Sequence, residues 1–150
     1  MNKKLHYVLF VLVSLFAISA NAAPMAFSVN SDSGNPTEDS LYLIDLATGS
    51  DQLIGKLFTG IETRLDTEGL AFAPDGTLWG IDDESRTLFP INTASGSINS
   101  LDEVPLAGFP GSGNDFGMTF SCDNSLYVTS VITQTLYRLK LDGSSEIIGA

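Results

Sequence analysis

The chain has 150 residues, with 18 acidic residues against seven Lys and Arg, one His and one Cys, and its formal net charge is −11. A single thiol excludes an intrachain disulfide and a closed zinc site of Cys and His ligands, and the acidity argues against nucleic-acid binding. The hydrophobic content of 43% is typical of a globular protein and not of a disordered acidic tail.

The first 22 residues are typical of a secretory signal peptide. Lys3 and Lys4 precede the apolar run of residues 5–17, and Ala20-Asn21-Ala22 has small residues where a signal peptidase cleaves. An uncleaved membrane anchor is the alternative, but the run is shorter than the ~20 residues of a bilayer span. We therefore expect export to the periplasm or the extracellular space of a bacterium, with no membrane attachment after cleavage.

Cleavage would remove the single His6, together with Lys3 and Lys4. The 128 residues that follow carry five basic and 18 acidic side chains, and their formal charge is −13. Without a His, neither a Ser-His-Asp nor a Cys-His hydrolase mechanism is open to this part of the chain.

Residues 23–150 repeat with a period of 47–48 residues. Gly49, Gly96 and Gly143 are 47 residues apart, and they end the similar phrases LYLIDLATG, LFPINTASG and LYRLKLDG. A second phrase, GLAFAPDGTLWGIDD from residue 69, matches GMTFSCDNSLYVTSV from residue 117. Apolar residues alternate with period two within each unit, which is typical of half-buried strands.

Each unit is predicted to form four short strands, a to d, joined by tight turns at groups such as Pro74-Asp75-Gly76. The middle unit has strands at about 69–73, 77–82, 87–92 and 97–101. The last unit has them at about 116–121, 125–130, 135–141 and 144–149. An incomplete first unit lacks strand a and has strands at about 25–29, 41–46 and 51–57.

Four antiparallel strands recurring at this period are typical of the blades of a β-propeller. The predicted fold class is therefore all-β, a partial β-propeller of about 2.7 four-stranded blades. The domain prediction is a signal peptide at 1–22 and an incomplete propeller at 23–150, with blades at about 25–57, 69–101 and 116–149. A β-sandwich is the alternative, but three phrases recurring in order favour the propeller.

The segment from Glu68 to Trp79, EGLAFAPDGTLW, resembles the "EGxAxxPDGxLy" phrase of secreted NHL, SMP-30 and YVTN propellers, and of phytase-like esterase propellers. WD and kelch propellers are set aside, because Gly-His and Trp-Asp pairs and adjacent glycines do not occur. In SMP-30-like lactonases a Glu that opens such a phrase binds the catalytic divalent metal, so the resemblance implies that role for Glu68. The lactonase phrase is of the "EGP" type, and Leu70 stands where that phrase has Pro.

In a meander of strands a to d, the b–c and d–a connections lie on one face. This face is predicted to carry the long connections 30–40, 58–67 and 102–115 and two thirds of the acids, against only Arg64 and Arg86. Its negative potential should favour cations or basic partners. The acids are Asp32, Glu38, Asp39, Glu62, Asp66, Glu68, Asp82, Asp83, Glu84, Asp102, Glu103 and Asp115.

The candidate metal ligands are Glu68, Asp115 and Asp82, which come from adjacent blades. Carboxylate oxygens suit Ca²⁺ or another divalent cation, and further ligands would have to come from blades outside this sequence. The alternatives are that Glu68 is a solvated residue at the start of a strand, and that Asp82-Asp83-Glu84 is a solvated hairpin tip. Asp75 and Asp123 are expected only to stabilise turns.

Two functions fit these features. The favoured one is an exported, non-catalytic propeller whose acidic face binds a protein, peptide or glycan, because no catalytic set is visible. The alternative is a divalent-metal-dependent lactonase or esterase-type hydrolase with Glu68 as a metal ligand. Because propellers close with about 4–8 blades, we expect either that the sequence is the N-terminal part of a longer propeller or that two copies close a ring.

Overall fold

The computed structural model of the chain describes residues 23–30, 39–64, 66–110 and 113–150. The predicted signal peptide lies outside the described residues, as do Asp32 and Glu38 of the predicted acidic face. The described chain is nearly all β, with one short 3₁₀ helix at Ser100–Asp102. None of its helices has the length and apolar character needed to cross a membrane.

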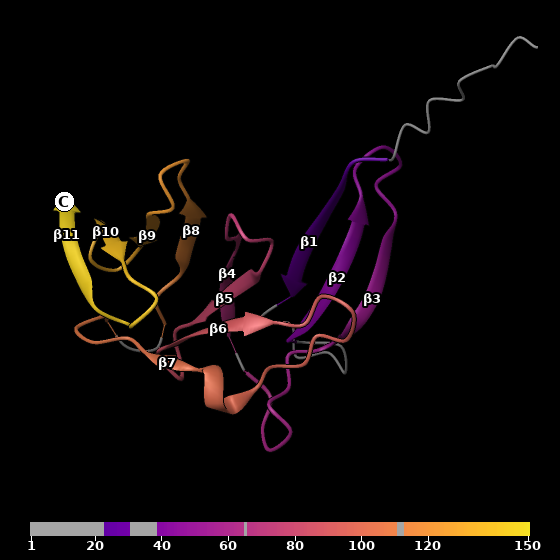
Figure 1. Cartoon of the computed structure of the whole chain (residues 1–150), viewed down its shortest axis with the longest axis horizontal. Helices are drawn as coiled ribbons and strands as arrows, with labels where there is room; N and C mark the ends of the chain where they lie inside the picture. Colours follow the sequence, from indigo (N-terminus) through magenta and orange to yellow (C-terminus); the bar gives the residue numbers. More distant parts are fainter. Residues whose placement is uncertain (1–22, 31–38, 65, 111–112) are drawn as a thin grey trace, which may run out of the picture.

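The strands form three antiparallel sheets, one for each sequence unit (Figure 1). The first has β1 (Met25–Asn30), β2 (Ser40–Asp45) and β3 (Asp51–Lys56). The second has β4 (Thr67–Phe72), β5 (Leu78–Asp82), β6 (Thr87–Ile91) and β7 (Val104–Pro105). The third has β8 (Phe116–Phe120), β9 (Leu126–Ser130), β10 (Thr135–Leu139) and β11 (Ser145–Gly149).

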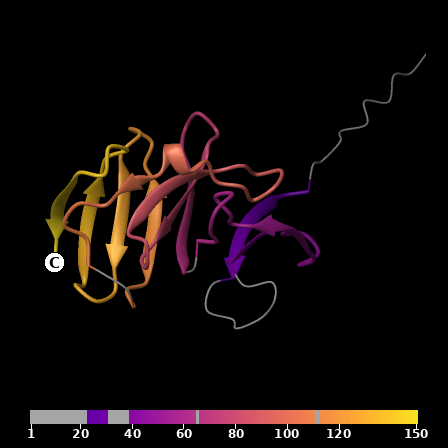
Figure 2. The same ribbon diagram turned by 90° about the horizontal axis from the view of Figure 1, so that it is seen from below.

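The sheets stand side by side, as Figure 2 shows, with β4 next to both β1 and β8. Within each sheet the strands follow in chain order, and every neighbouring pair is antiparallel. The first sheet has three strands because its unit lacks strand a, as the repeat predicts. The prediction of an all-β, partial β-propeller is therefore confirmed.

One hydrophobic core lies between each pair of neighbouring sheets, which is how stacked repeats bury surface that no single repeat can bury alone. Between the first and second sheets the buried residues are Leu41, Leu57, Leu78, Phe89, Ile91 and Ile98. Between the second and third sheets they are Ile81, Leu88, Leu106, Phe109, Phe116, Leu126, Val128, Tyr137 and Leu139. Alternate residues of β5 serve the two cores, since Leu78 belongs to the first and Ile81 to the second.

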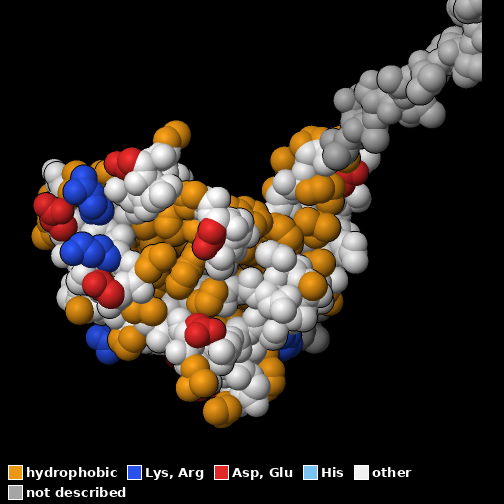
Figure 3. All heavy atoms as spheres, in the orientation of Figure 1, with side chains coloured by type: hydrophobic (Ala, Val, Ile, Leu, Met, Phe, Trp, Pro, Cys, Tyr) orange, Lys and Arg blue, Asp and Glu red, His pale blue; other side chains and the backbone are white. Residues whose placement is uncertain are grey.

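The hollow between the two outer sheets is lined by hydrophobic side chains (Figure 3). Phe72, which ends β4, is 48% exposed and packs edge-on against Phe27 of β1, with 5.8 Å between the ring centroids. On the face seen in Figure 3, the acidic side chains stand apart from one another.

The turn residues have the structural roles that the sequence predicts. The carboxylate of Asp75 accepts a hydrogen bond from the backbone N–H of Thr77 at 2.9 Å, and that of Asp123 accepts one from Ser125 at 3.1 Å. Gly76 has a φ of +86°, a conformation that residues with a Cβ rarely adopt. Both Asp side chains thus stabilise the turn between strands a and b of their unit.

The outer strand of the second sheet differs from the prediction of a strand over 97–101. The chain makes only two isolated bridges here, from Ile98 to Ile91 and from Ser97 to Phe58, and it then turns through the 3₁₀ helix before β7 pairs with β6. Asn99 causes this turn, because its side chain accepts a hydrogen bond from Leu101 N at 3.2 Å and donates one to Asp102 at 2.8 Å. Pro105 can end the sheet because an edge strand needs no N–H on its free side.

Candidate functional site

The b–c and d–a connections meet, as expected for a meander. The carboxylate of Asp39 accepts a hydrogen bond from the backbone N–H of Asp66 at 3.2 Å. The carboxylate of Asp83 accepts one from the backbone N–H of Asn114 at 2.7 Å. Each bond joins the b–c connection of one sheet to the d–a connection that leads into the next sheet, so acids far apart in the sequence are brought together.

Four of these acids form what we call the inner acidic cluster: Asp66, Glu68, Asp83 and Asp115. The Asp66 carboxyl group lies within hydrogen-bonding range of those of Glu68 and Asp83, and the charge of Asp115 also acts on Glu68. Two carboxyl groups can form such a hydrogen bond only when one of them is protonated. Asp83 is 1% exposed, whereas Asp66 and Glu68 are half-buried and Asp115 is exposed.

Burial and like charge disfavour ionisation of Glu68 and Asp83 in this cluster. Desolvation is the main cause that raises the pKa of Glu68 to about 7, and the contact with Asp66 and the charges of Asp66, Asp115 and Asp83 raise it further. Desolvation also raises the pKa of Asp83, although the hydrogen bond from Asn114 N opposes this shift. Near neutral pH, Glu68 therefore still holds a proton for part of the time.

Three buried polar atoms at or beside the cluster have no hydrogen-bond partner within the described part of the chain: Asp66 Oδ1, Asp83 Oδ1 and Asn114 Nδ2. The amide orientation of Asn114 is fixed, because its Oδ1 accepts hydrogen bonds from Ser130 Oγ at 2.8 Å and Ile132 N at 3.0 Å. A buried polar atom without a partner costs about 1–3 kcal/mol. The site thus has two acceptors and one donor that no described residue satisfies.

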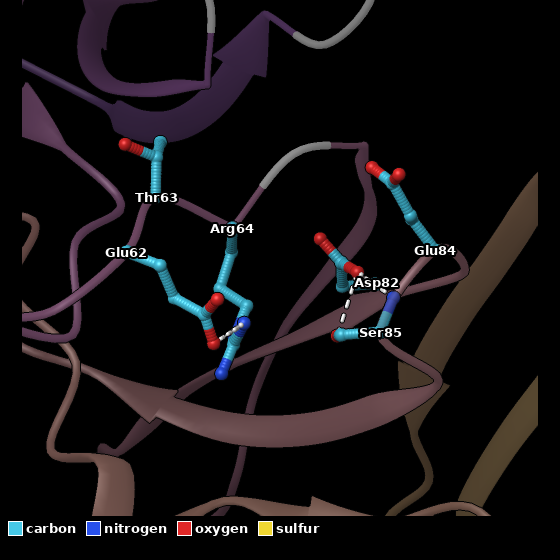
Figure 4. A pocket seen from close by; sticks show the side chains of 6 residues that line it. All are labelled: Glu62, Thr63, Arg64, Asp82, Glu84 and Ser85. Atoms are coloured by element: carbon cyan, nitrogen blue, oxygen red, sulfur yellow. Dashed lines mark hydrogen bonds and ion pairs between the residues drawn. The ribbon is translucent and has the colours of Figure 1, made fainter.

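Asp82, the third candidate metal ligand, lies elsewhere. It lines a cavity of about 280 Å³ that no member of the inner acidic cluster lines (Figure 4). Its Oδ1 accepts hydrogen bonds from the N–H and the hydroxyl of Ser85, each at 2.7 Å. Burial raises the pKa of Asp82 to about 6, against the opposing effect of these bonds.

The repeat indicates a structural role for Asp82. Asn30 and Ser130 occupy the same place at the end of strand b, since each of the three residues lies opposite the first residue of strand c. Asn30 Oδ1 accepts a hydrogen bond from Ser40 N at 3.1 Å, and Ser130 Oγ accepts one from Thr133 N at 3.2 Å. In every sheet, therefore, the side chain at this position stabilises the b–c connection.

Arg64 neutralises other acids on the same face. Its guanidinium forms a bidentate pair with Glu103, in which Nη2 lies 2.5 Å from Oε2, and it reaches Glu62 at 2.8 Å (Figure 4). Arg64 and Glu103 are nearly buried, with side chains 10% and 11% exposed, whereas Glu62 is 63% exposed. These contacts raise the pKa of Arg64 above its ordinary value, Glu103 contributing most.

The described residues do not fit a metal centre. The structure brings Glu68 and Asp115 close enough for their charges to interact, but it places Asp82 in the other cavity. Across residues 23–30, 39–64, 66–110 and 113–150, no three His, Cys, Asp or Glu side chains are grouped so that they could hold a metal ion. A ligand role for Glu68, Asp115 and Asp82 thus stays a prediction that would need further groups.

The interpretation of Asp82-Asp83-Glu84 as a solvated hairpin tip is wrong for two of its three residues. Asp82 and Asp83 are 0% and 1% exposed, and only Glu84 faces solvent. The connection from β7 to β8 covers Asp83, since Asn114 N donates to its carboxylate. The three consecutive acids in the sequence gave no indication that another connection buries Asp83.

Sequence reasoning singled out Glu68, but it placed Asp66 only on the acidic face and gave Asn114 no role. A signal for them existed, because these two residues are 48 apart and therefore occupy equivalent places before strand a in successive units. The roles of Arg64 and Glu103 had no comparable signal, since they are 39 residues apart and in different connections.

Comparison with known proteins shows the fold. No family model and no curated protein matches the sequence. A catalytically inactive virginiamycin B lyase from Staphylococcus aureus, solved with quinupristin, is similar in structure, with a TM-score of 0.51 and 18% identity over 76% of this chain and 35% of that one. A structural-genomics protein of unknown function from Bacteroides thetaiotaomicron has a TM-score of 0.54 and 17% identity over 72% of this chain and 27% of that one.

The chain thus spans about a third or less of the length of these two proteins. Identities this low support a common fold and no common activity. The resemblance to NHL, SMP-30 and YVTN propellers stays a prediction at the level of the family. The chain has a β-propeller-type fold.

Proposed function

We propose that this chain belongs to an exported propeller that acts as a binding module and takes a cationic protein or peptide ligand at the inner acidic cluster. The observation that carries the proposal is the pair of buried carboxylate oxygens, Asp66 Oδ1 and Asp83 Oδ1, that accept no hydrogen bond from the described residues. A ligand that donates hydrogen bonds and carries positive charge would satisfy these oxygens and neutralise their charge.

The position of the cluster supports this function. It lies on the connections that join successive sheets, and long connections on one face of a rigid scaffold are where binding residues concentrate. The high formal negative charge of the chain would also steer a basic partner toward it and speed association at low salt.

The test is binding of a basic peptide and of an acidic peptide of matched length to the full chain, measured by calorimetry at several salt concentrations. We expect only the basic peptide to bind, with an affinity that falls as salt rises, and Glu68→Gln to weaken it. Glu84→Gln is the matched control, because Glu84 is an exposed acid in the same set of connections. Equal binding of both peptides would overturn the proposal.

The alternative function is a divalent-metal-dependent lactonase or esterase. The raised pKa of Glu68 is suited to an acid–base group, but the described acids lack the grouping that a metal requires. The two functions differ in their response to Ca²⁺, because an ion that binds only the folded chain must raise the melting temperature. The same melting temperature with Ca²⁺ and with a chelator would count against the hydrolase.

A further inference from the structure

The inner acidic cluster has the chemistry to recognise one kind of cation. We infer that the cluster binds the guanidinium group of an arginine side chain presented by a polypeptide. This inference rests on the proposed function and names the class of its ligand. Four features of the site favour this ligand: the burial of Asp83, the negative charge of Asp66 and Asp83, the spread of the carboxylates, and the unpaired donor of Asn114.

Asp83 provides a buried carboxylate whose position is fixed. Its carboxylate is held in place at Oδ2 by the N–H of Asn114, at 2.7 Å, while the residue as a whole is 1% exposed. Its second oxygen, Oδ1, is buried and accepts nothing from the described residues, and neither does Oδ1 of the neighbouring Asp66. Such atoms need an explanation in a folded protein, and a bound donor supplies one.

The charge of these two acids is not compensated within the described chain. Its salt bridges pair Arg64 with Glu62 and Glu103, and Arg138 with Glu146, and none of them involves Asp66 or Asp83. Arg64 is already engaged by two carboxylates and cannot serve the cluster without leaving them. A partner from outside the described residues would bring both positive charge and N–H donors.

Spread carboxylates favour a guanidinium over a metal ion. A metal needs several oxygens that converge on one point, and the described acids do not provide that grouping. A guanidinium instead carries five N–H donors in a planar fork, so it can bond two carboxylates in different directions at once. Asp66 and Asp83, which approach each other from different connections, suit this planar donor.

The donor beside the cluster explains why the ligand should be a polypeptide. Asn114 Nδ2 is buried without a partner in the described structure, and a guanidinium has no acceptor to offer it. A backbone carbonyl next to the arginine in sequence would supply one. The outer part of the cluster is open to solvent, because Asp115 is exposed and Asp66 and Glu68 are half-buried. The three unpaired atoms are themselves buried, so binding requires side chains of the cluster to move aside.

The inference is tested with three short peptides that are identical except at one position, which holds arginine, lysine or citrulline. Citrulline keeps the shape of arginine without its charge. Binding to the full chain is measured by calorimetry for the wild type, Asp66→Asn, Asp83→Asn and the control Asp51→Asn. Asn suits position 66, where φ is +78°, and it can still accept the Asn114 hydrogen bond at position 83. Asp51 is an exposed acid at the start of β3.

We expect the arginine peptide to bind at least about tenfold more tightly than the citrulline and lysine peptides. Asp66→Asn and Asp83→Asn should each weaken binding of the arginine peptide by at least about tenfold. Asp51→Asn should leave the affinity within about twofold of the wild type. Equal affinities for arginine and citrulline, or an unchanged affinity in Asp83→Asn, would overturn the inference.

Three further outcomes show whether the guanidinium assignment fails alone or together with the proposed polypeptide ligand. If the lysine peptide binds as well as the arginine peptide, the guanidinium assignment fails, while a cation-binding acidic face survives. If Ca²⁺ binds and none of the peptides does, a metal takes the place of the arginine and the inference fails. If neither Ca²⁺ nor any basic peptide binds, both the inference and the proposed function fail.

Discussion

Arg64 shows how single residues divide the acids of this chain into neutralised and unneutralised groups. Its guanidinium satisfies Glu103 with two bonds and Glu62 with one, in a place where little solvent remains. The side-chain hydrogen bonds of Arg64 within the described chain go to Glu62 and Glu103, so none of them reaches the inner acidic cluster. The same face thus holds two sets of acids. Glu62 and Glu103 are paired with Arg64, which we call the closed network, whereas no salt bridge among the described residues involves Asp66 or Asp83 of the inner acidic cluster.

Breaking the closed network should cost stability. Glu103→Gln removes the charge from a nearly buried bidentate pair, and we expect a loss of about 1.5–3 kcal/mol in the free energy of unfolding. Glu62→Gln removes the same charge from a side chain that is 63% exposed, so its effect should stay below about 1 kcal/mol. Urea unfolding of both variants measures the difference, and equal losses would contradict the buried role of Glu103.

For single residues, the sequence predicted which side chains matter better than it predicted their burial and contacts. Glu68 was recognisable because it opens a strand phrase, and Asp75 because it stands in a tight turn. Asp83 was not recognisable, because its burial depends on Asn114, which is 31 residues away in another connection. Long-range cover of this kind leaves no local pattern in one sequence.

Between the sheets, glycine sets how closely the elements approach. A Cβ at Gly69 of β4 would lie 2.9 Å from Ile81 Cγ2, 3.1 Å from the backbone oxygen of Phe116 and 3.3 Å from Met118 Cγ. Two of these atoms belong to β8, so Gly69 allows the innermost strands of two sheets to lie together. Gly117, its equivalent one repeat later, would meet only Thr129 Oγ1, at 2.8 Å.

Substitutions at these two glycines should therefore differ in effect. Gly69→Ala forces a backbone or core shift between β4 and β8, and we expect it to destabilise the chain by about 1–3 kcal/mol. Gly117→Ala displaces only the hydroxyl of one threonine and should cost clearly less. Thermal unfolding compares them, and a larger loss for Gly117→Ala would contradict the packing of β4 on β8.

Strands were predictable as elements wherever their apolar residues alternate and a turn bounds them. Strands β4, β5, β6 and β8 to β11 begin and end within about two residues of the ranges read from the repeat. The outer strand of the second sheet was misplaced, because Asn99 bends the chain through hydrogen bonds that alternation does not encode.

For the whole molecule, the period of 47–48 residues predicted the architecture, because each unit can bury its apolar residues only against a neighbour. The two cores between sheets are the direct result. The site could be predicted only as an acidic face. Its assembly required the connections of two different units to meet, which the repeat implies for the backbone but not for particular side chains.

We propose that the inner acidic cluster binds a cation, and the most direct test is an NMR pH titration of the Glu68 side-chain carboxyl carbon. In the free chain we predict a pKa of about 7, above the ordinary 4.5, because burial and neighbouring acids favour the protonated form. With the arginine peptide bound, this pKa should fall, because a cation favours the ionised form. A pKa near 4.5 in the free chain that the peptide leaves unchanged would contradict the account.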